Sequence, residues 1–288
     1  MSRDAASRTR LLYVTDPTDG DAYVLSLPTG KLVGKLTGFD QPLGDCVDAE
    51  GNVFIAISQS AQIREFKHGS KAAFNVLDDS GYYPLGCSVD PTTGNLAVTN
   101  IISRGSHSDP GSVAIYTKAK GTPKYYTDAG IYLYGYCAYD QTGNLYIDGI
   151  ARNHDPQVAE LPKGGKAFQS ITLNQSLGGK NVSTLQWDGT SLAIASQSSA
   201  VIYQFAISGS SGTEVGSTTL KGESSILAFW IQPTKKGQTL YAPVFQNQSI
   251  GDVGVYHYPA GGKASKTYFA VVDPYAATVS INLSKRSK

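Results

Sequence analysis

The sequence predicts an all-β protein, a six-bladed β-propeller of four-stranded blades. The first observation is a repeat: an apolar strand ending near Asp, a turn with Gly-Asn or an equivalent, a second apolar strand, a polar loop, and a third strand rich in Tyr or Phe. The second is that long helical periodicity is absent from the 288 residues. A small four-stranded sheet cannot bury both faces alone, so we expect the units to stack radially around a channel.

Three copies of the repeat are clear. They read PLGDCVDAEGNVFIA from Pro42, PLGCSVDPTTGNLAVTN from Pro84 and YGYCAYDQTGNLYID from Tyr134. In each copy the Gly of the turn supplies the positive φ of a tight hairpin, and the Asp and Asn beside it are expected to be turn formers. Aligned on the second strand, the six units begin at intervals of about 40 to 50 residues, near Arg10, Gly51, Gly94, Gly143, Thr190 and Gln238.

The two ends of the chain predict how the ring closes. The segment Asp273–Ile281 matches the first strand of a repeat and then stops, whereas Leu11–Asp16 matches a second strand that lacks its first. We therefore expect the C-terminal strand to pair with the N-terminal blade, which removes free strand edges. The expected division is a flexible segment at 1–9, one propeller at 10–281 and a basic tail at 282–288.

Composition excludes some classes of partner. Lys plus Arg is 24 and Asp plus Glu is 23, and positive charge gathers only in the tail at Lys285–Lys288. We therefore expect no nucleic-acid partner. No apolar run approaches the roughly 20 residues of a transmembrane helix, so no membrane span is expected. The chain is also expected to be a monomer.

Cellular location is inferred from composition. Charged residues are only 16% of a chain rich in Gly, Ser, Thr, Tyr and Asn, which is common in exported bacterial β proteins. Residues 1–10 carry no apolar segment, so a secretory signal is missing from this sequence. An extracytoplasmic or secreted protein is the prediction. The cysteines Cys46, Cys87 and Cys137 are an odd number without C-x-x-C spacing, and we expect buried small residues rather than a disulfide framework or a zinc site.

The best copy of the repeat resembles an NHL repeat. Pro42–Asp48, Gly51–Ala56 and Ile63–Phe66 follow the pattern Pro-x-Gly-x-x-Val-Asp, Gly-Asn, a strand and Ile-x-x-Phe. The units near Trp187 and Trp230 are degenerate, and the whole chain also resembles uncharacterised six-bladed bacterial proteins. The resemblance implies a six-bladed propeller. NHL-type propellers include binders of protein, RNA and small molecules and a few lyases, so function does not follow.

A ligand site is expected on the face that carries the blade-to-blade connections. Tyrosine offers a flat apolar ring with a polar tip, which suits glycans, peptides and other amphipathic ligands. Two neighbouring loops also place His near Asp. The alternative is that these rings cap blade interfaces. The candidate ligand-binding residues are Phe39, Tyr82, Tyr83, Tyr132, Tyr134 and Tyr275, with Arg104, His107, Arg152 and His154 from the polar loops.

The predicted function is a non-catalytic module that binds a glycan, peptide or small molecule. No G-x-S-x-G, H-E-x-x-H, P-loop or G-x-G-x-x-G motif is present. The alternative is a metal-dependent ester or lactone hydrolase, because the predicted architecture resembles that of gluconolactonase-type propellers, which hold a divalent metal at the channel. The best candidate ligands for calcium or a similar ion are Asp45, Asn100 and Asp148. Otherwise no cofactor is expected, and a structural or self-associating role is the third possibility.

Overall fold

The computed structural model describes residues 1–2, 4–106, 108–178, 184–196, 198–235, 237–246, 250–268 and 271–283. Within this part of the chain the fold is all β apart from two 3-10 turns, η1 (Ala5–Ser7) and η2 (Thr117–Ala119). No helix among these residues is long and apolar enough to cross a membrane.

Four of the sheets in the described residues have four antiparallel strands each. The first sheet has the order β24 (Ala277–Ile281), β1 (Arg10–Asp16), β2 (Asp21–Ser26) and β3 (Lys31–Thr37). The second is β4 (Pro42–Val47), β5 (Val53–Ile57), β6 (Gln62–Phe66) and β7 (Ala73–Asp78). The third is β8 (Tyr82–Val89), β9 (Leu96–Ser103), β10 (Pro110–Tyr116) and β11 (Lys124–Tyr126). The last along the chain is β20 (Trp230–Thr234), β21 (Gly237–Gln246), β22 (Ile250–Tyr258) and β23 (Gly261–Tyr268).

A fifth sheet has eight strands in the order β12-β13-β14-β15-β19-β18-β17-β16. Its first half is β12 (Leu133–Tyr139), β13 (Leu145–Ile150), β14 (Pro156–Leu161) and β15 (Gln169–Leu173). Its second half is β16 (Leu185–Trp187), β17 (Leu192–Ala195), β18 (Val201–Ser208) and β19 (Ser211–Thr219). The halves meet through a short parallel pairing in which Thr172 and Leu173 lie opposite Ser211 and Gly212.

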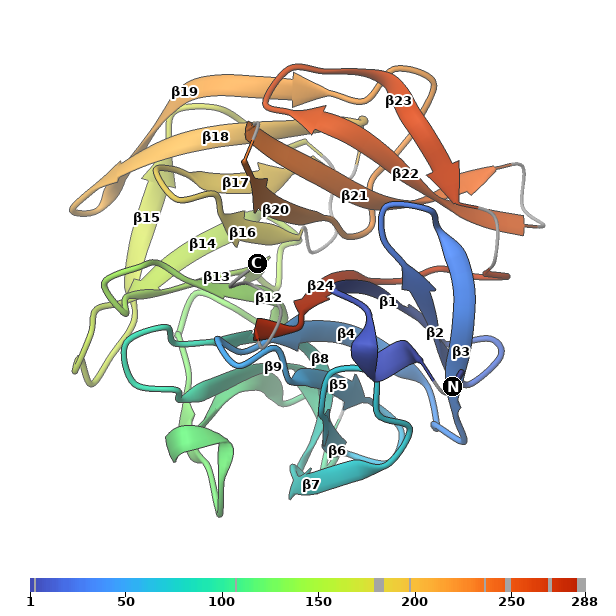
Figure 1. Ribbon diagram of the computed structural model, residues 1–288. Coiled ribbons are helices and arrows are strands. Elements are labelled where there is room, and N and C mark those ends of the chain that lie inside the picture. The colour runs from blue at the N-terminus through green and yellow to red at the C-terminus, as the bar shows by residue number, and fades with distance from the viewer. Residues whose placement is uncertain are drawn as a thin grey trace.

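The sheets stand around a common axis, which gives the chain a propeller-like fold (Figure 1). Nearest the centre of the view are the strands β4, β8, β12, β16, β20 and β24. Because each sheet is antiparallel, its turns alternate between two faces of the ring. The face that carries the connections 38–41, 79–81 and 127–132 is called the loop face, and the opposite face, with the turns 48–52, 90–95 and 140–144, is called the hairpin face.

The ring closes as the two chain ends predict. β24 pairs antiparallel with β1, from Arg10 opposite Ile281 to Val14 opposite Ala277. His68 reinforces this seam, because its Nδ1 lies 2.7 Å from the Ser280 hydroxyl and its Nε2 lies 2.9 Å from the Arg8 carbonyl.

The turns have the chemistry that their sequences predict. Asp48 accepts hydrogen bonds from both the backbone and the side-chain nitrogen of Asn52, each at 2.7 Å. Asp140 and Asn144 repeat this arrangement at 3.0 and 2.9 Å. Gly51 has a φ of 87°, a backbone conformation that is sterically unfavourable for residues with a Cβ atom. Between the sheets, apolar side chains from facing surfaces pack together, as Tyr13 and Leu11 do with Ile55.

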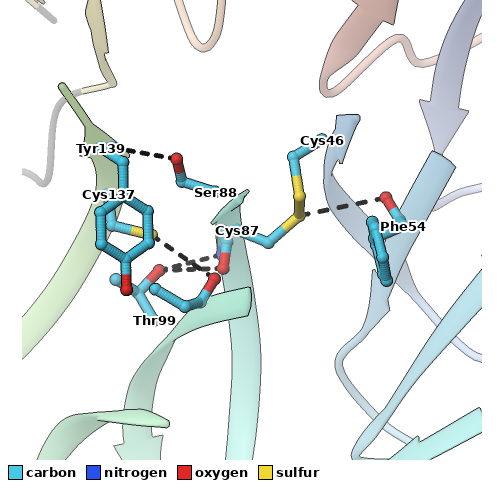
Figure 2. Close-up of a disulfide and its surroundings, with 9 residues drawn as sticks. Cys46, Phe54, Cys87, Ser88, Thr99, Cys137 and Tyr139 are labelled. Atoms are coloured by element: carbon cyan, nitrogen blue, oxygen red, sulfur yellow. Dashed lines mark hydrogen bonds between the residues drawn. A yellow bond between two sulfur atoms is a disulfide. The ribbon is translucent and has the colours of Figure 1, made fainter. Parts of the chain in front are cut away.

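Two of the cysteines form a disulfide, which corrects the expectation of three buried free thiols (Figure 2). Cys46 on β4 is bonded to Cys87 on β8, with 5.7 Å between their Cα atoms. The bond joins the innermost strands of two successive sheets. Cys137 on β12 keeps a free thiol and is buried as predicted, and burial raises the pKa of that thiol.

Candidate functional site

Two arginines on the loop face each cover a predicted tyrosine. The guanidinium carbon of Arg104 lies 4.4 Å from the centre of the Tyr83 ring, and that of Arg152 lies 4.2 Å from the centre of the Tyr132 ring. Both arginines also donate to backbone carbonyls of the preceding unit: Arg104 to Ser58 at 2.7 Å and Arg152 to Ser108 at 2.6 Å. These four predicted residues therefore form two equivalent Arg–Tyr pairs that tie neighbouring loops together.

The other predicted loop-face residues have varied environments. Phe39 is buried edge-on against Phe66, and Tyr134 is fully buried, with its hydroxyl hydrogen-bonded to Asp128. Tyr82 is half-buried and packs on Tyr125, with ring centres 5.0 Å apart.

Of the two predicted histidines, His154 can be placed. It is exposed and has a φ of 66° in the turn after β13. His107 lies outside the described residues.

A cleft of about 550 Å³ opens beside one of the Arg–Tyr pairs. Tyr132 and Arg152 line it, together with Pro110, Asn153 and the segment 127–131. The cleft is therefore a place on the loop face where two predicted residues face a hollow large enough for a small ligand.

The loop-face end of the central channel is filled by side chains. Leu43, Leu85 and Tyr136 pack together there, with Ile101 and Tyr275 against them. The hydroxyls of Tyr136 and Tyr275 are hydrogen-bonded to each other, and burial raises the pKa of both. Tyr275, the last of the five predicted tyrosines, is thus part of an apolar plug across the channel.

The three predicted metal ligands lie on different strands. Asp148 on β13 accepts the backbone N–H of Tyr136 at 2.5 Å, and the Asn100 amide on β9 donates to the Ser112 hydroxyl at 3.2 Å. Asp45 on β4 borders the channel, but both of its carboxylate oxygens are buried and have no hydrogen-bond partner within the described chain. Burial raises its pKa well above the usual value.

Asp148 has a structural counterpart in two other units. Thr99 accepts the backbone N–H of Gly86 at 3.0 Å, and Thr15 accepts that of Ala276 at 3.1 Å. In each case a side-chain oxygen of the second strand accepts a hydrogen bond from a backbone N–H at the adjacent innermost strand. Within the described residues, no three His, Cys, Asp or Glu side chains lie close enough together to hold a metal ion.

Beyond the plug, the channel contains a cavity of about 400 Å³, called the channel cavity here. It is lined by residues of β4, β8, β12, β16, β20 and β24 and by the hairpin-face turns at Asp140 and Asp188. Its wall carries the aromatic side chains Tyr136, Tyr139, Trp187, Phe229 and Trp230. The acidic residues in the lining are Asp45, Asp140 and Asp188, and no basic residue of the described ranges lines it.

Trp187 and Trp230 are partly exposed and firmly held. The Trp187 ring stacks on Tyr146, with 5.8 Å between centres and an interplanar angle of 11°. The Trp230 indole N–H donates to Gln232 at 3.0 Å. Sequence reasoning treated these two units only as degenerate repeats. The available signal was that the chain has two tryptophans in all and that both occur where a first strand is expected.

Comparisons with known proteins identify the fold only. No protein-family model matches the chain, and no curated protein matches it. Among solved structures, a chain of a nidogen/laminin complex aligns with a TM-score of 0.70 and 14% identity, covering 95% of this chain and 99% of that one. A protein of unknown function from Bacteroides caccae aligns with a TM-score of 0.66 and 12% identity, covering 94% of this chain and 99% of that one. A functionally unknown protein from Desulfotomaculum acetoxidans aligns with a TM-score of 0.60 and 12% identity, covering 92% of this chain and 82% of that one. The chain is thus similar in fold to β-propellers of these kinds.

Proposed function

We propose that this chain is a non-catalytic ligand-binding module and that the channel cavity receives the ligand. The observation that carries the proposal is a cavity of about 400 Å³ whose wall, within the described residues, combines five aromatic side chains with acidic groups and no basic group. Binding sites for small molecules are concave and largely apolar, with a few polar groups that fix orientation. The cavity has these properties, and its volume is suited to a small molecule rather than a folded partner.

The lining favours a ligand with an apolar body and a positive charge. Trp187 and Trp230 offer the rings that attract cations best, and the carboxylates of Asp140 and Asp188 add negative potential at the rim. An organic ammonium ion matches both features. An anionic ligand would meet carboxylates without a compensating cation.

The side chains around the cavity support binding rather than catalysis. Its described lining contains no His or Lys, and the buried carboxyl of Asp45, whose pKa burial raises, is its candidate general base. Cys46 and Cys87 are joined in the disulfide, and burial raises the pKa of the Cys137 thiol, which disfavours the nucleophilic thiolate.

Intrinsic fluorescence tests this proposal directly, because both tryptophans of the chain line the channel cavity. We would titrate the protein with choline and, as a neutral isostere, 3,3-dimethylbutan-1-ol. The expected result is a saturable change in emission with choline and a much smaller one with the alcohol. Trp230→Phe should weaken choline binding, whereas Phe74→Leu, at an exposed site on β7, should not. No saturable change with choline would contradict the proposal.

The loop face remains the place that the sequence predicts for a glycan, peptide or small molecule. Its support is the cleft of about 550 Å³ beside Tyr132 and Arg152. Tyr132→Ala should reduce binding there without altering choline binding in the channel cavity. The two sites can therefore be separated with one variant each.

A metal-dependent hydrolase is the second candidate. What favours it is that Asp45 and Asn100 both have buried side-chain oxygens without a partner among the residues described. The test is thermal unfolding with chelator and then with calcium, magnesium, manganese or zinc. A metal at about 100 times its dissociation constant adds roughly 2.7 kcal/mol, which raises the midpoint by several degrees. No shift with any ion would remove this candidate.

We also infer that the ring has six blades of the NHL-like type, with the eight-stranded sheet counted as two blades joined at their outer edges. The short pairing of β15 with β19 supports this division, since it involves only two residue pairs. So does the channel cavity, whose lining draws on six innermost strands.

An extracytoplasmic location fits the Cys46–Cys87 disulfide, because disulfides persist in oxidising compartments. We propose that the protein functions there as a monomer. Fractionation of the source cells, followed by sedimentation of the purified chain, would test both points. A reduced protein confined to the cytosol would contradict the location.

A further inference from the structure

A hollow larger than the channel cavity lies away from the channel, between the sheet of β20–β23 and the sheet that contains β24 and β1. It has a volume of about 820 Å³ and is called the seam groove here. Its lining comes from the start of β1, the turn after β2, the β20–β21 turn, β21, β22, β23 and the end of β24. Because it lies between the first and last sheets, it is built from both ends of the chain.

The charges of the seam groove have one sign. Arg10, Lys235 and Lys266 line it together with His257, and no carboxylate of a described residue does. No ion pair within the described ranges involves any of these three cationic side chains. The Lys266 ammonium does donate to the Pro28 carbonyl at 3.3 Å, which holds it at the edge of the groove. A fixed, uncompensated positive potential attracts anions.

Arg10 lies beside two tyrosines at the floor of the groove. Burial raises the pKa of Tyr241 to about 12 and raises that of Tyr268, and the positive charge of Arg10 offsets part of both effects. The Tyr268 hydroxyl donates to Pro28 at 3.0 Å. Tyr241 is buried at this floor, next to the guanidinium.

The rest of the lining is rich in hydroxyl and amide groups. These groups belong to Thr9, Thr234, Gln238, Thr239 and Ser265. The aliphatic side chains apart from proline are Val255, which is buried, and Ile281. The lining also contains the rings of Tyr241, Tyr256 and Tyr268, so the groove combines apolar, largely aromatic surface suited to the faces of sugar rings with hydrogen-bonding groups and several cations.

We propose that the seam groove binds an acidic oligosaccharide, a chain of sugars that bear carboxylates. The three cationic side chains suit successive carboxylates, and Arg10 can hold one of them in a bidentate pair. The hydroxyl-rich lining suits the sugar hydroxyls, and the volume of about 820 Å³ accommodates several sugar units. This site does not depend on the channel cavity, whose lining has the opposite charge.

Calorimetric titration with tetragalacturonic acid tests the proposal, and its fully methyl-esterified form is the matched neutral ligand. We expect binding of the acid, much weaker binding of the ester, and a loss of affinity as salt is raised. Lys235→Glu and Lys266→Glu should each weaken binding at least roughly tenfold, because each removes a charge-assisted contact and adds repulsion. Lys163→Glu, an exposed reversal in another sheet, should leave affinity unchanged.

Three outcomes would overturn the proposal. The first is no binding of tetragalacturonic acid by the intact chain. The second is that the chain binds the acid and its ester with equal affinity, or that the parent and both the Lys235→Glu and Lys266→Glu variants bind the acid with equal affinity. The third is that a short poly-glutamate peptide binds while the oligosaccharide does not. Choline binding in the channel cavity should be unaffected by Lys235→Glu. A failure of the seam-groove proposal can therefore be distinguished from a failure of the channel-cavity proposal.

Discussion

Ser88 and Cys137 occupy, one unit further along the chain, the positions that Cys46 and Cys87 occupy in the disulfide. Cys46 lies opposite Phe54 in its sheet, and Ser88 lies opposite Ala97 in the next. The Cys87 sulfur is 4.0 Å from the Phe54 carbonyl oxygen, and the Cys137 sulfur is 3.8 Å from that of Ala97. Figure 2 shows the four side chains on neighbouring innermost strands.

This equivalence predicts that Ser88→Cys forms a second disulfide with Cys137. In the chain-entropy model, a bridge that closes a loop of this length stabilises the fold by about 4 kcal/mol, since it restricts the unfolded chain. Thiol titration of the denatured, unreduced variant should find no free thiol, and its melting temperature should rise. Ser88→Cys combined with Cys137→Ser should show neither effect. A variant that keeps two free thiols would show that the two seams differ.

The closure of the ring predicts unequal effects of two truncations. Removal of residues 276–288 deletes β24, exposes the edge of β1 and breaks the Thr15–Ala276 hydrogen bonds. Removal of residues 1–8 deletes η1 and the contact of His68 with Arg8, a smaller part of the same seam. We expect the first truncation to lower the melting temperature far more than the second. Equal melting temperatures would mean that the β24–β1 pairing contributes little.

The all-β fold, the ring closure and the turns could be predicted because they depend on local pattern. The Asp48–Asn52 turn needs only its own residues. The disulfide was missed because it depends on how two sheets stack, yet a signal existed. Cys46 follows Pro42 by four residues and Cys87 follows Pro84 by three, so in alternating strands the two point to opposite faces, each toward the other sheet.

The candidate site was harder to predict because orientation decides it. Sequence places Tyr83 and Tyr132 on the loop face, but cannot show that Arg104 and Arg152 lie across their rings. Nor can it show that the channel is filled near Tyr136 and open toward the hairpin face. These features depend on side chains from several sheets, which a repeat pattern does not relate to one another.

Burial of Asp45 predicts that Asp45→Asn stabilises the protein at neutral pH. Because burial raises the pKa in the folded state, the carboxyl favours its protonated form, and stability falls as pH rises from the unfolded value near 4 through the raised folded value. The variant cannot ionise, so its gain in melting temperature should be present at pH 8 and absent near pH 3. Asp109→Asn, at an exposed position, is the control.

The opposite result would be informative. If Asp45→Asn were less stable than the parent at pH 8, and only when a divalent ion was present, the ionised carboxylate would be holding that ion. Melting curves with chelator and with calcium separate the two cases. In chelator, the stabilising effect of the substitution should be seen whichever case holds.

Arg104 is predicted to stabilise the loop face through its shape as well as its charge. Its guanidinium donates to the carbonyls of Ser58, Gln59 and Tyr82 while it covers Tyr83. Hydrogen bonds from a charged donor contribute more than neutral ones, so Arg104→Ala should cost about 2 kcal/mol after allowance for partial exposure. Urea unfolding would measure this change in the free energy of unfolding.

Arg104→Lys is the matched control for charge. A lysine keeps the positive charge, but its single ammonium cannot reach three carbonyls and stack on Tyr83 at the same time. We therefore expect Arg104→Lys to recover less than half of the stability that Arg104→Ala loses. Full recovery would mean that the charge alone matters, and the equivalent pair of Arg152 and Tyr132 should then tolerate Arg152→Lys equally well.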